Sequence, residues 1–225
     1  MPLTPLLHIT AAYSNAVLIA ILPNVSDTAK TLNLPISQPI TLEQVAGFNT
    51  SPYADNIGGG LWLTNGYWFV INYGYVDTFS SPNNWFRTPN FEDLEKFRGK
   101  DNMTTNAAID FARESFSKLG YKPENYHLNE PPTEFEPPYD GKNIGHIPFC
   151  KVGWQNFPTN GGDNLKGYSI TFEIDMHHKT LVGMSVMGRT LWHSNITINV
   201  KTELQSDYKK RYGTNPPINY YVPPS

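Results

Sequence analysis

The 225-residue sequence contains a single cysteine, Cys150. One thiol cannot form a disulfide within the chain and cannot supply a cysteine-rich metal site. The sequence therefore marks neither an oxidising nor a reducing compartment. Because Cys150 alternates with Val152 and Trp154, we expect it to be a small, buried apolar residue of a β-strand.

Charged residues are also scarce. They make up 16% of the chain, and the formal net charge is -3, whereas a typical domain has about 25% charged residues. The densest basic run, Lys209-Lys210-Arg211, is too short to form a phosphate-neutralising face. We therefore expect no nucleic acid partner. Low charge combined with 13% aromatic residues predicts an ordered globular protein.

The sequence has no long apolar run. Its longest run, residues 16–22, is far shorter than the about 20 residues that a membrane-spanning helix needs. The N-terminal residues lack the basic region and cleavage site of a signal peptide. We expect no transmembrane segment. The compartment is left open, and a secreted or periplasmic location would require a leader that has been removed.

Helical patterns dominate the first residues. Apolar side chains recur at helical spacing over residues 5–22, and Pro23 is expected to end that helix. Ser26 then fits the N-cap of a second short helix within residues 24–34. Residues 40–48 fit either a short strand or a turn of helix.

An aromatic hairpin is predicted next. Asn65-Gly66 lies between the apolar runs 61–63 and 67–76, and this dipeptide is typical of a type I′ turn joining antiparallel strands. Residues 80–90 and 98–102 are polar and rich in turn-forming residues, with a short helix expected over 91–97 between them.

The second half predicts a helix followed by three strands. The helix covers residues 105–119, begins at Thr104 or Thr105 and ends before Gly120. The strands are expected at residues 147–154, 168–176 and 180–187. In the second strand apolar residues alternate with outward-facing Ser169, Thr171, Glu173 and Asp175. This alternation predicts an antiparallel sheet covered on one side only, by the helix.

Four motifs of this second half carry a resemblance: Ala107-Ala108-Ile109-Asp110-Phe111-Ala112, Leu119-Gly120-Tyr121, Ile170-Thr171-Phe172-Glu173-Ile174-Asp175 and Thr180-Leu181-Val182-Gly183. The half resembles the helix-plus-antiparallel-sheet layout of cystatin-like and PepSY-like domains. The resemblance is closer still to functionally uncharacterised bacterial envelope-type proteins built on this layout. It covers roughly a third of the chain and implies partner binding or protease inhibition. The chain departs from the pattern at His178-Lys179, where such turns carry glycine, and it lacks the Q-x-V-x-G inhibitory loop of cystatins.

These patterns predict an α+β protein of two tandem units, each a helix packed on an antiparallel sheet. The units are expected at residues 1–98 and 103–200, and we interpret the first as a degenerate copy of the second. A further strand is expected over 194–200. Residues 201–225 are expected to form a helix-like segment, 202–212, followed by a Pro-rich tail.

Candidate catalytic and metal-binding groups are few. The pair His177-His178 beside Asp175 is the main histidine-rich feature, and His146 and His193 lie elsewhere. A zinc site needs three or four converging ligands, so we expect solvated turn histidines, with no metal and no cofactor. The carboxylates of the Pro-rich connection are interpreted as solvated loop charges: Glu130, Glu134, Glu136 and Asp140. No catalytic residue is predicted.

Aromatic residues concentrate in the first hairpin and supply the candidate binding residues: Trp62, Tyr67, Trp68, Tyr73 and Tyr75, with Phe79, Trp85 and Phe86 nearby. Such a cluster can form an exposed platform for a sugar or a protein partner, or an interface between the two units. We expect a non-catalytic binding or interaction protein, with inhibition as one form of that role. Its partner would be a protein or a small ligand. The alternatives are a hydrolase with an unrecognised site and a carbohydrate-binding module.

Overall fold

The structure, a computed structural model, describes residues 6–84, 100–128, 133–134, 147–156, 168–187 and 203–215. They form helices and antiparallel strands, which confirms the α+β class. The chain divides into two compact units. The first contains residues 1–30, 35–77 and 191–225, and the second contains residues 31–34 and 78–190. The elements predicted over 91–97 and 194–200 lie outside the described residues.

Helix α1 (Ala11–Thr31) is the main helix of the first unit. It begins after Thr10, whose hydroxyl oxygen accepts a hydrogen bond from the Tyr13 amide at 3.1 Å. The prediction that Pro23 ends the helix is wrong, because α1 continues through it. An internal proline costs a helix about 3 kcal/mol. The apolar side chains buried on both sides of Pro23, which are Val17, Leu18, Ile21, Leu22 and Val25, offset that cost.

Ser26 is not the N-cap of a second helix, as the sequence predicted, because it lies within α1. Its side chain is buried, and the hydroxyl oxygen accepts a hydrogen bond from the Ile40 amide at 2.9 Å. The short 3₁₀ helix η1 (Leu42–Gln44) follows, and strand β2 (Val45–Thr50) comes directly after it. Residues 40–48 therefore contain both of the alternatives that the sequence left open.

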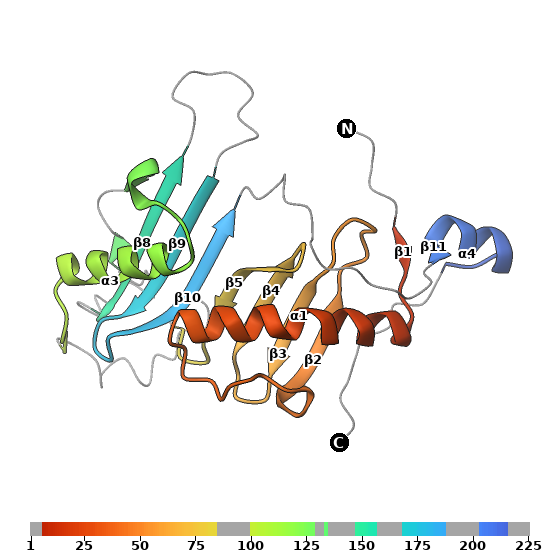
Figure 1. Ribbon diagram of the computed structural model, residues 1–225, viewed down its shortest axis with the longest axis horizontal. Coiled ribbons are helices and arrows are strands. Elements are labelled where there is room, and N and C mark those ends of the chain that lie inside the picture. Colours follow the sequence, from red (N-terminus) through yellow and green to blue (C-terminus); the bar gives the residue numbers. More distant parts are fainter. Residues whose placement is uncertain are drawn as a thin grey trace, which may run out of the picture. The chain divides into compact units, whose positions relative to one another are not determined.

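The sheet of the first unit contains β2, β3 (Gly59–Leu63), β4 (Trp68–Asn72) and the beginning of β5 (Tyr75–Ser80), in that order. Helix α1 lies across it (Figure 1). One face supplies the buried core residues Phe48, Leu61, Phe69 and Ile71. The Ser14 and Thr50 hydroxyls hydrogen-bond at 2.6 Å and link α1 to β2.

The hairpin predicted at Asn65-Gly66 is confirmed as β3–β4, but its turn type differs. The Leu63 amide donates to the Tyr67 carbonyl at 2.8 Å, and the Gly66 amide donates to the Leu63 carbonyl at 3.0 Å. Gly66 has a φ of 85°, whereas Asn65 is not among the residues with positive φ. The connection is therefore a three-residue loop with one left-handed residue, which replaces the expected type I′ turn.

A turn with two left-handed residues lies at Tyr73-Gly74 instead. Their φ angles are 53° and 82°, as a type I′ turn requires. This turn divides the single strand predicted over 67–76 into β4 and β5. A bulky residue is rarely left-handed. The turn is stabilised by Asn56, whose Oδ1 accepts from the Tyr73 amide at 2.8 Å, and by Asn24, whose Nδ2 donates to the Gly74 carbonyl at 2.7 Å.

The second unit contains α3 (Thr105–Lys118), which begins at the predicted residue and ends one residue before the predicted end. The Thr104 hydroxyl oxygen caps it by accepting from the Ala107 amide at 3.2 Å, and Gly120 has a φ of 84° just after its end. Phe116 of α3 packs against Trp154 and Phe172, with ring centroids 5.2 and 6.3 Å away.

The sheet under α3 is antiparallel (Figure 1). Its order is the end of β5, then β10 (Thr180–Met187), β9 (Tyr168–Asp175) and β8 (Phe149–Asn156). Two short strands, β6 (His127–Leu128) and β7 (Thr133–Glu134), both pair with β8, and the 3₁₀ helix η2 (Pro123–Asn125) precedes them. Cys150 is buried in β8, as predicted.

The prediction that this sheet has one solvated polar face is wrong. Glu173 and Asp175 are only 6% and 3% exposed. Glu173 accepts a hydrogen bond from Asn84 Nδ2 at 2.7 Å and pairs with Lys151 Nζ at 3.0 Å. Gly183 leaves room for this cluster, because a Cβ atom there would overlap Glu173 Oε2. Asn84 and Lys151 are therefore specific partners of the Glu173 carboxylate.

Residues near the two ends of the described chain form a separate small substructure within the first unit. Strand β1 (Leu7–His8) pairs with β11 (Glu203–Leu204), which places His8 opposite Glu203. Helix α4 (Gln205–Tyr212) follows β11 and ends at Gly213, whose φ is 74°. Helix α4 confirms the helix-like segment predicted over 202–212. None of the helices in the described part of the chain is both long and apolar enough to cross a lipid bilayer.

Candidate functional site

The face of the first-unit sheet opposite the core carries an exposed tryptophan. We call this surface the Trp62 face and define it by Trp62, Trp68, Gly47, Gly60 and Asn49. Trp62 is 43% exposed. A Cβ atom at Gly60 would lie 2.9 Å from Cη2 of its indole, and one at Gly47 would lie 3.9 Å from Cε3. The indole therefore packs over the two glycines, which have no side chains beneath the ring.

Trp68 lies beside Trp62 because the two residues are cross-strand partners on β3 and β4. Their ring centroids are 6.4 Å apart and the ring planes are inclined by 34°. Trp68 is half-buried, so Trp62 supplies most of the accessible aromatic surface. Asn49 is partly exposed on the same face, since it pairs with Gly60. The face thus combines an indole surface with an amide that can both donate and accept hydrogen bonds.

The other candidate aromatics are divided between the two sides of the sheet. Tyr67 is buried on the core side and stacks on Phe69, with centroids 6.4 Å apart. Asn72 Nδ2 donates to Asp77 Oδ2 at 2.8 Å, so Asp77 lies on the side of Asn72 and Trp68. Alternation along β5 then places Tyr75 on that side too. Trp85 and Phe86 lie outside the described residues.

Tyr73 occupies the turn and not the face. Burial, together with the nearby Asp55 and Asp77 carboxylates, raises its pKa above the usual value. Burial alone raises the pKa of Tyr67. Both phenols therefore stay protonated at neutral pH. Of the five aromatic residues singled out in the sequence, the structure brings Trp62 and Trp68 into contact, places Tyr75 on the same side, and separates Tyr67 and Tyr73 from them.

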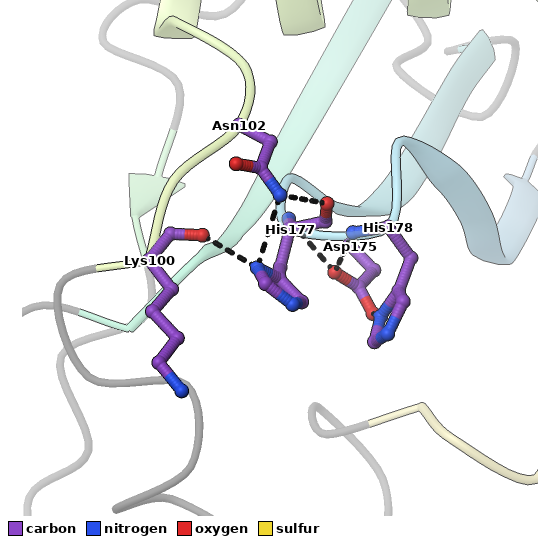
Figure 2. A network of polar contacts seen from close by, with 5 residues as sticks. All are labelled: Lys100, Asn102, Asp175, His177 and His178. Atoms are coloured by element: carbon purple, nitrogen blue, oxygen red, sulfur yellow. Dashed lines mark hydrogen bonds and ion pairs between the residues drawn. The ribbon is translucent and has the colours of Figure 1, made fainter.

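The turn between β9 and β10 holds the pair of histidines (Figure 2). Asp175 Oδ1 accepts hydrogen bonds from the amides of His177 and His178, both at 2.9 Å. Its Oδ2 atom lies 2.6 Å from Nδ1 of His178. Nδ1 of His177 lies 2.7 Å from the Lys100 carbonyl oxygen, and Asn102 Nδ2 donates to the His177 carbonyl at 2.8 Å.

The Asp175 carboxylate only accepts hydrogen bonds, so its contact places a proton on Nδ1 of His178. Nδ1 of His177 lies near both an acceptor, the Lys100 carbonyl oxygen, and a donor, Asn102 Nδ2 at 3.2 Å, so its role depends on the tautomer. Hydrogen bonds of this kind also orient metal-binding histidines. However, the described residues contain no group of three or more histidine, cysteine or carboxylate side chains that could hold a metal ion. Hydrogen bonds to the Asp175 carboxylate order the turn, and the His178 side chain is 55% exposed. His146 and His193 lie outside the described residues.

A cavity of about 860 Å³ lies beside α4, within the first unit. We call it the α4 cavity. Its lining combines aromatic rings with charges of both signs: His8, Thr10, Glu203, Asp207, Tyr208, Lys210, Arg211 and Tyr212. Arg211 Nη1 lies 3.2 Å from Glu203 Oε1. Hydrogen bonding to the Tyr212 side chain and the charge of Glu203 raise the pKa of Arg211.

No pattern in the sequence predicted the α4 cavity. One signal was present, because Tyr208 and Tyr212 are four residues apart in a predicted helix and so share one of its sides. The partner of that side, His8, lies far away in the sequence and has no periodic pattern to connect it with α4.

Comparison of the chain with protein-family models, with curated proteins and with solved structures found no significant match in any of the three.

Proposed function

We propose that the chain is a non-catalytic binding protein that holds a carbohydrate on the Trp62 face. The proposal is carried by one observation: the Trp62 indole is 43% exposed and lies over Gly60 and Gly47. Trp62 is in ring contact with Trp68, so the two indoles form a contiguous aromatic surface, and contiguous exposed apolar surfaces are typical of ligand-binding sites. Sugars present a face of C–H groups that packs on an aromatic ring, and their hydroxyl groups match an amide such as that of Asn49.

The arrangement of the rings supports an extended ligand rather than a single sugar. The ring centroids of Trp62 and Trp68 lie 6.4 Å apart, and the ring planes differ by 34°. Neighbouring units of an oligosaccharide can therefore pack on neighbouring indoles.

The relation between the two units is part of the same proposal. We propose that the two units are related as tandem helix-on-sheet units of the cystatin-like or PepSY-like type. Support comes from α3, which packs through Phe116 on β8 and β9, and from α1, which packs on β2 through Ser14. PepSY-like domains are associated with partner binding, which agrees with a non-catalytic role.

The test measures binding of the full chain to neutral oligosaccharides and polysaccharides. Tryptophan fluorescence and titration calorimetry report the binding. Trp62→Ala should weaken binding about tenfold, which corresponds to about 1.4 kcal/mol. Gly60→Ala should weaken it as well, because the new methyl group would meet the indole at 2.9 Å and displace it. Tyr53→Ala is the matched control, since Tyr53 is an exposed aromatic residue outside the face. Equal affinities of the Trp62→Ala variant and the unmodified chain would contradict the proposal.

A further inference from the structure

We infer that the α4 cavity is a second ligand site and that it binds a neutral oligosaccharide. The inference uses residues of β1, β11 and α4 and does not depend on the Trp62 face. A cavity of about 860 Å³ falls in the upper part of the range in which small-molecule sites are found, roughly 300–1,000 Å³. Its size suits a ligand of several sugar units better than a single small metabolite.

One wall of the α4 cavity is a row of three rings. The ring centroids of His8 and Tyr208 are 4.2 Å apart, and those of Tyr208 and Tyr212 are 4.5 Å apart. The two tyrosines share one side of α4, and His8 comes from β1. Tyr212 is 55% exposed, so much of this aromatic surface is accessible to a ligand. Rings in a row offer stacking positions to successive sugar units.

The charges around the row are balanced. Glu203 and Asp207 supply two carboxylates, while Lys210 and Arg211 supply two cations. Arg211 and Glu203 already form an ion pair at 3.2 Å. An anionic ligand would need an excess of cations, and a cationic ligand would need an excess of carboxylates. The lining has neither excess, and this balance favours a neutral ligand.

A neutral ligand must still satisfy the polar groups that it covers, because burying an unsatisfied charged group is costly. Sugar hydroxyls meet this requirement, since each one can donate to Asp207 and accept from Lys210. Their C–H faces cover Tyr212 at the same time. An apolar ligand of similar size would leave these charges without hydrogen bonds. The combination of three rings and balanced charges therefore selects a saccharide.

The experiment titrates the full chain with maltotriose, cellotriose and chitotriose as neutral probes and with sialyllactose as an acidic probe. Binding is measured by calorimetry, and the His8 imidazole signal is followed by NMR. We expect at least one neutral probe to shift the His8 signal at concentrations up to about 10 mM. Tyr212→Ala should lower the affinity about tenfold, whereas Tyr212→Phe, which keeps the ring, should stay within about twofold.

The variants separate this site from the Trp62 face. In a Trp62→Ala background the shift of the His8 signal should persist and should still depend on Tyr212. Tyr53→Ala serves as the control for loss of an exposed tyrosine elsewhere. The inference is overturned if no neutral probe shifts the His8 signal, if Tyr212→Ala binds as well as the unmodified chain, or if sialyllactose binds more tightly than every neutral probe. Loss of binding in Trp62→Ala alone would support the first proposal and count against the second.

Discussion

Substitution of Gly183 by alanine should destabilise the second unit strongly, although glycine to alanine is a small change. Gly183 lies on β10 under the Glu173 carboxylate. A Cβ atom there would lie 2.6 Å from Asn84 Nδ2 and would overlap Glu173 Oε2. The new methyl group must therefore displace the carboxylate from its position between Asn84 and Lys151.

The size of the effect follows from the contacts that are lost. The hydrogen bond from Asn84 Nδ2 to Glu173 is 2.7 Å long and buried, and a hydrogen bond to a charged group contributes about 1.5–3 kcal/mol. The ion pair with Lys151 adds little, because the Lys151 side chain is 39% exposed and such pairs contribute about 0–1 kcal/mol. We expect a loss of about 1.5–4 kcal/mol.

The assay is chemical unfolding in urea, with thermal unfolding as a second measurement. A loss of this size should lower Tm by about 3–16 °C for a protein of this length. Gly47→Ala is the control, because it also changes a strand glycine. Its added Cβ atom would lie 3.9 Å from Trp62 Cε3, which is an ordinary van der Waals distance. It should change stability by no more than about 0.5 kcal/mol.

A double substitution checks the mechanism. In a Glu173→Ala background the carboxylate is absent, so Gly183→Ala should cost much less than it does alone. Two results would refute the reasoning. One is a loss of less than about 0.5 kcal/mol for Gly183→Ala, and the other is an equal loss in both backgrounds.

Two further predictions concern the Asp175 turn and the buried tyrosine. Asp175→Ala should destabilise the chain by about 2–3 kcal/mol, since two amides and His178 lose their acceptor. Asp175→Asn keeps an acceptor for the amides and should cost less. Equal losses of the two variants in urea unfolding would show that the hydrogen bonds to the amides do not stabilise the turn. Burial raises the pKa of Tyr67 above 10.0, so its contribution to stability is complete below pH 10.0 and is lost as the pH rises through the folded-state pKa. Tyr67→Phe should reduce this alkaline loss of stability, and an unchanged pH profile would show that burial of the phenol is not its cause.

Local patterns in the sequence were sufficient for α3 and for the β3–β4 hairpin. Thr104 caps α3 and Gly120 follows its end, while Gly66 supplies the left-handed residue of the hairpin loop. These features depend on contacts between residues only a few positions apart, and such contacts can be recognised in a single sequence. The antiparallel strands of the second unit were predictable for the same reason.

Other features depend on residues distant in the sequence. Helix α1 passes through Pro23 because its apolar side chains are buried on both sides of the proline. Tyr73 is left-handed because Asn56 and Asn24 bind the turn from other segments. Periodicity could not distinguish Glu173 from a solvated residue, since its partner Asn84 lies 89 positions away.

The candidate sites divide in the same way. The sequence by itself determined that aromatic residues would gather on the first hairpin, because alternation along a strand is a local property. Only the tertiary structure decided that Trp62 is exposed over Gly60 while Tyr67 is in the core. The α4 cavity was decided entirely by tertiary structure. Pairing of β1 with β11 brings the His8 ring into contact with the Tyr208 ring. No pattern within either segment predicts this contact.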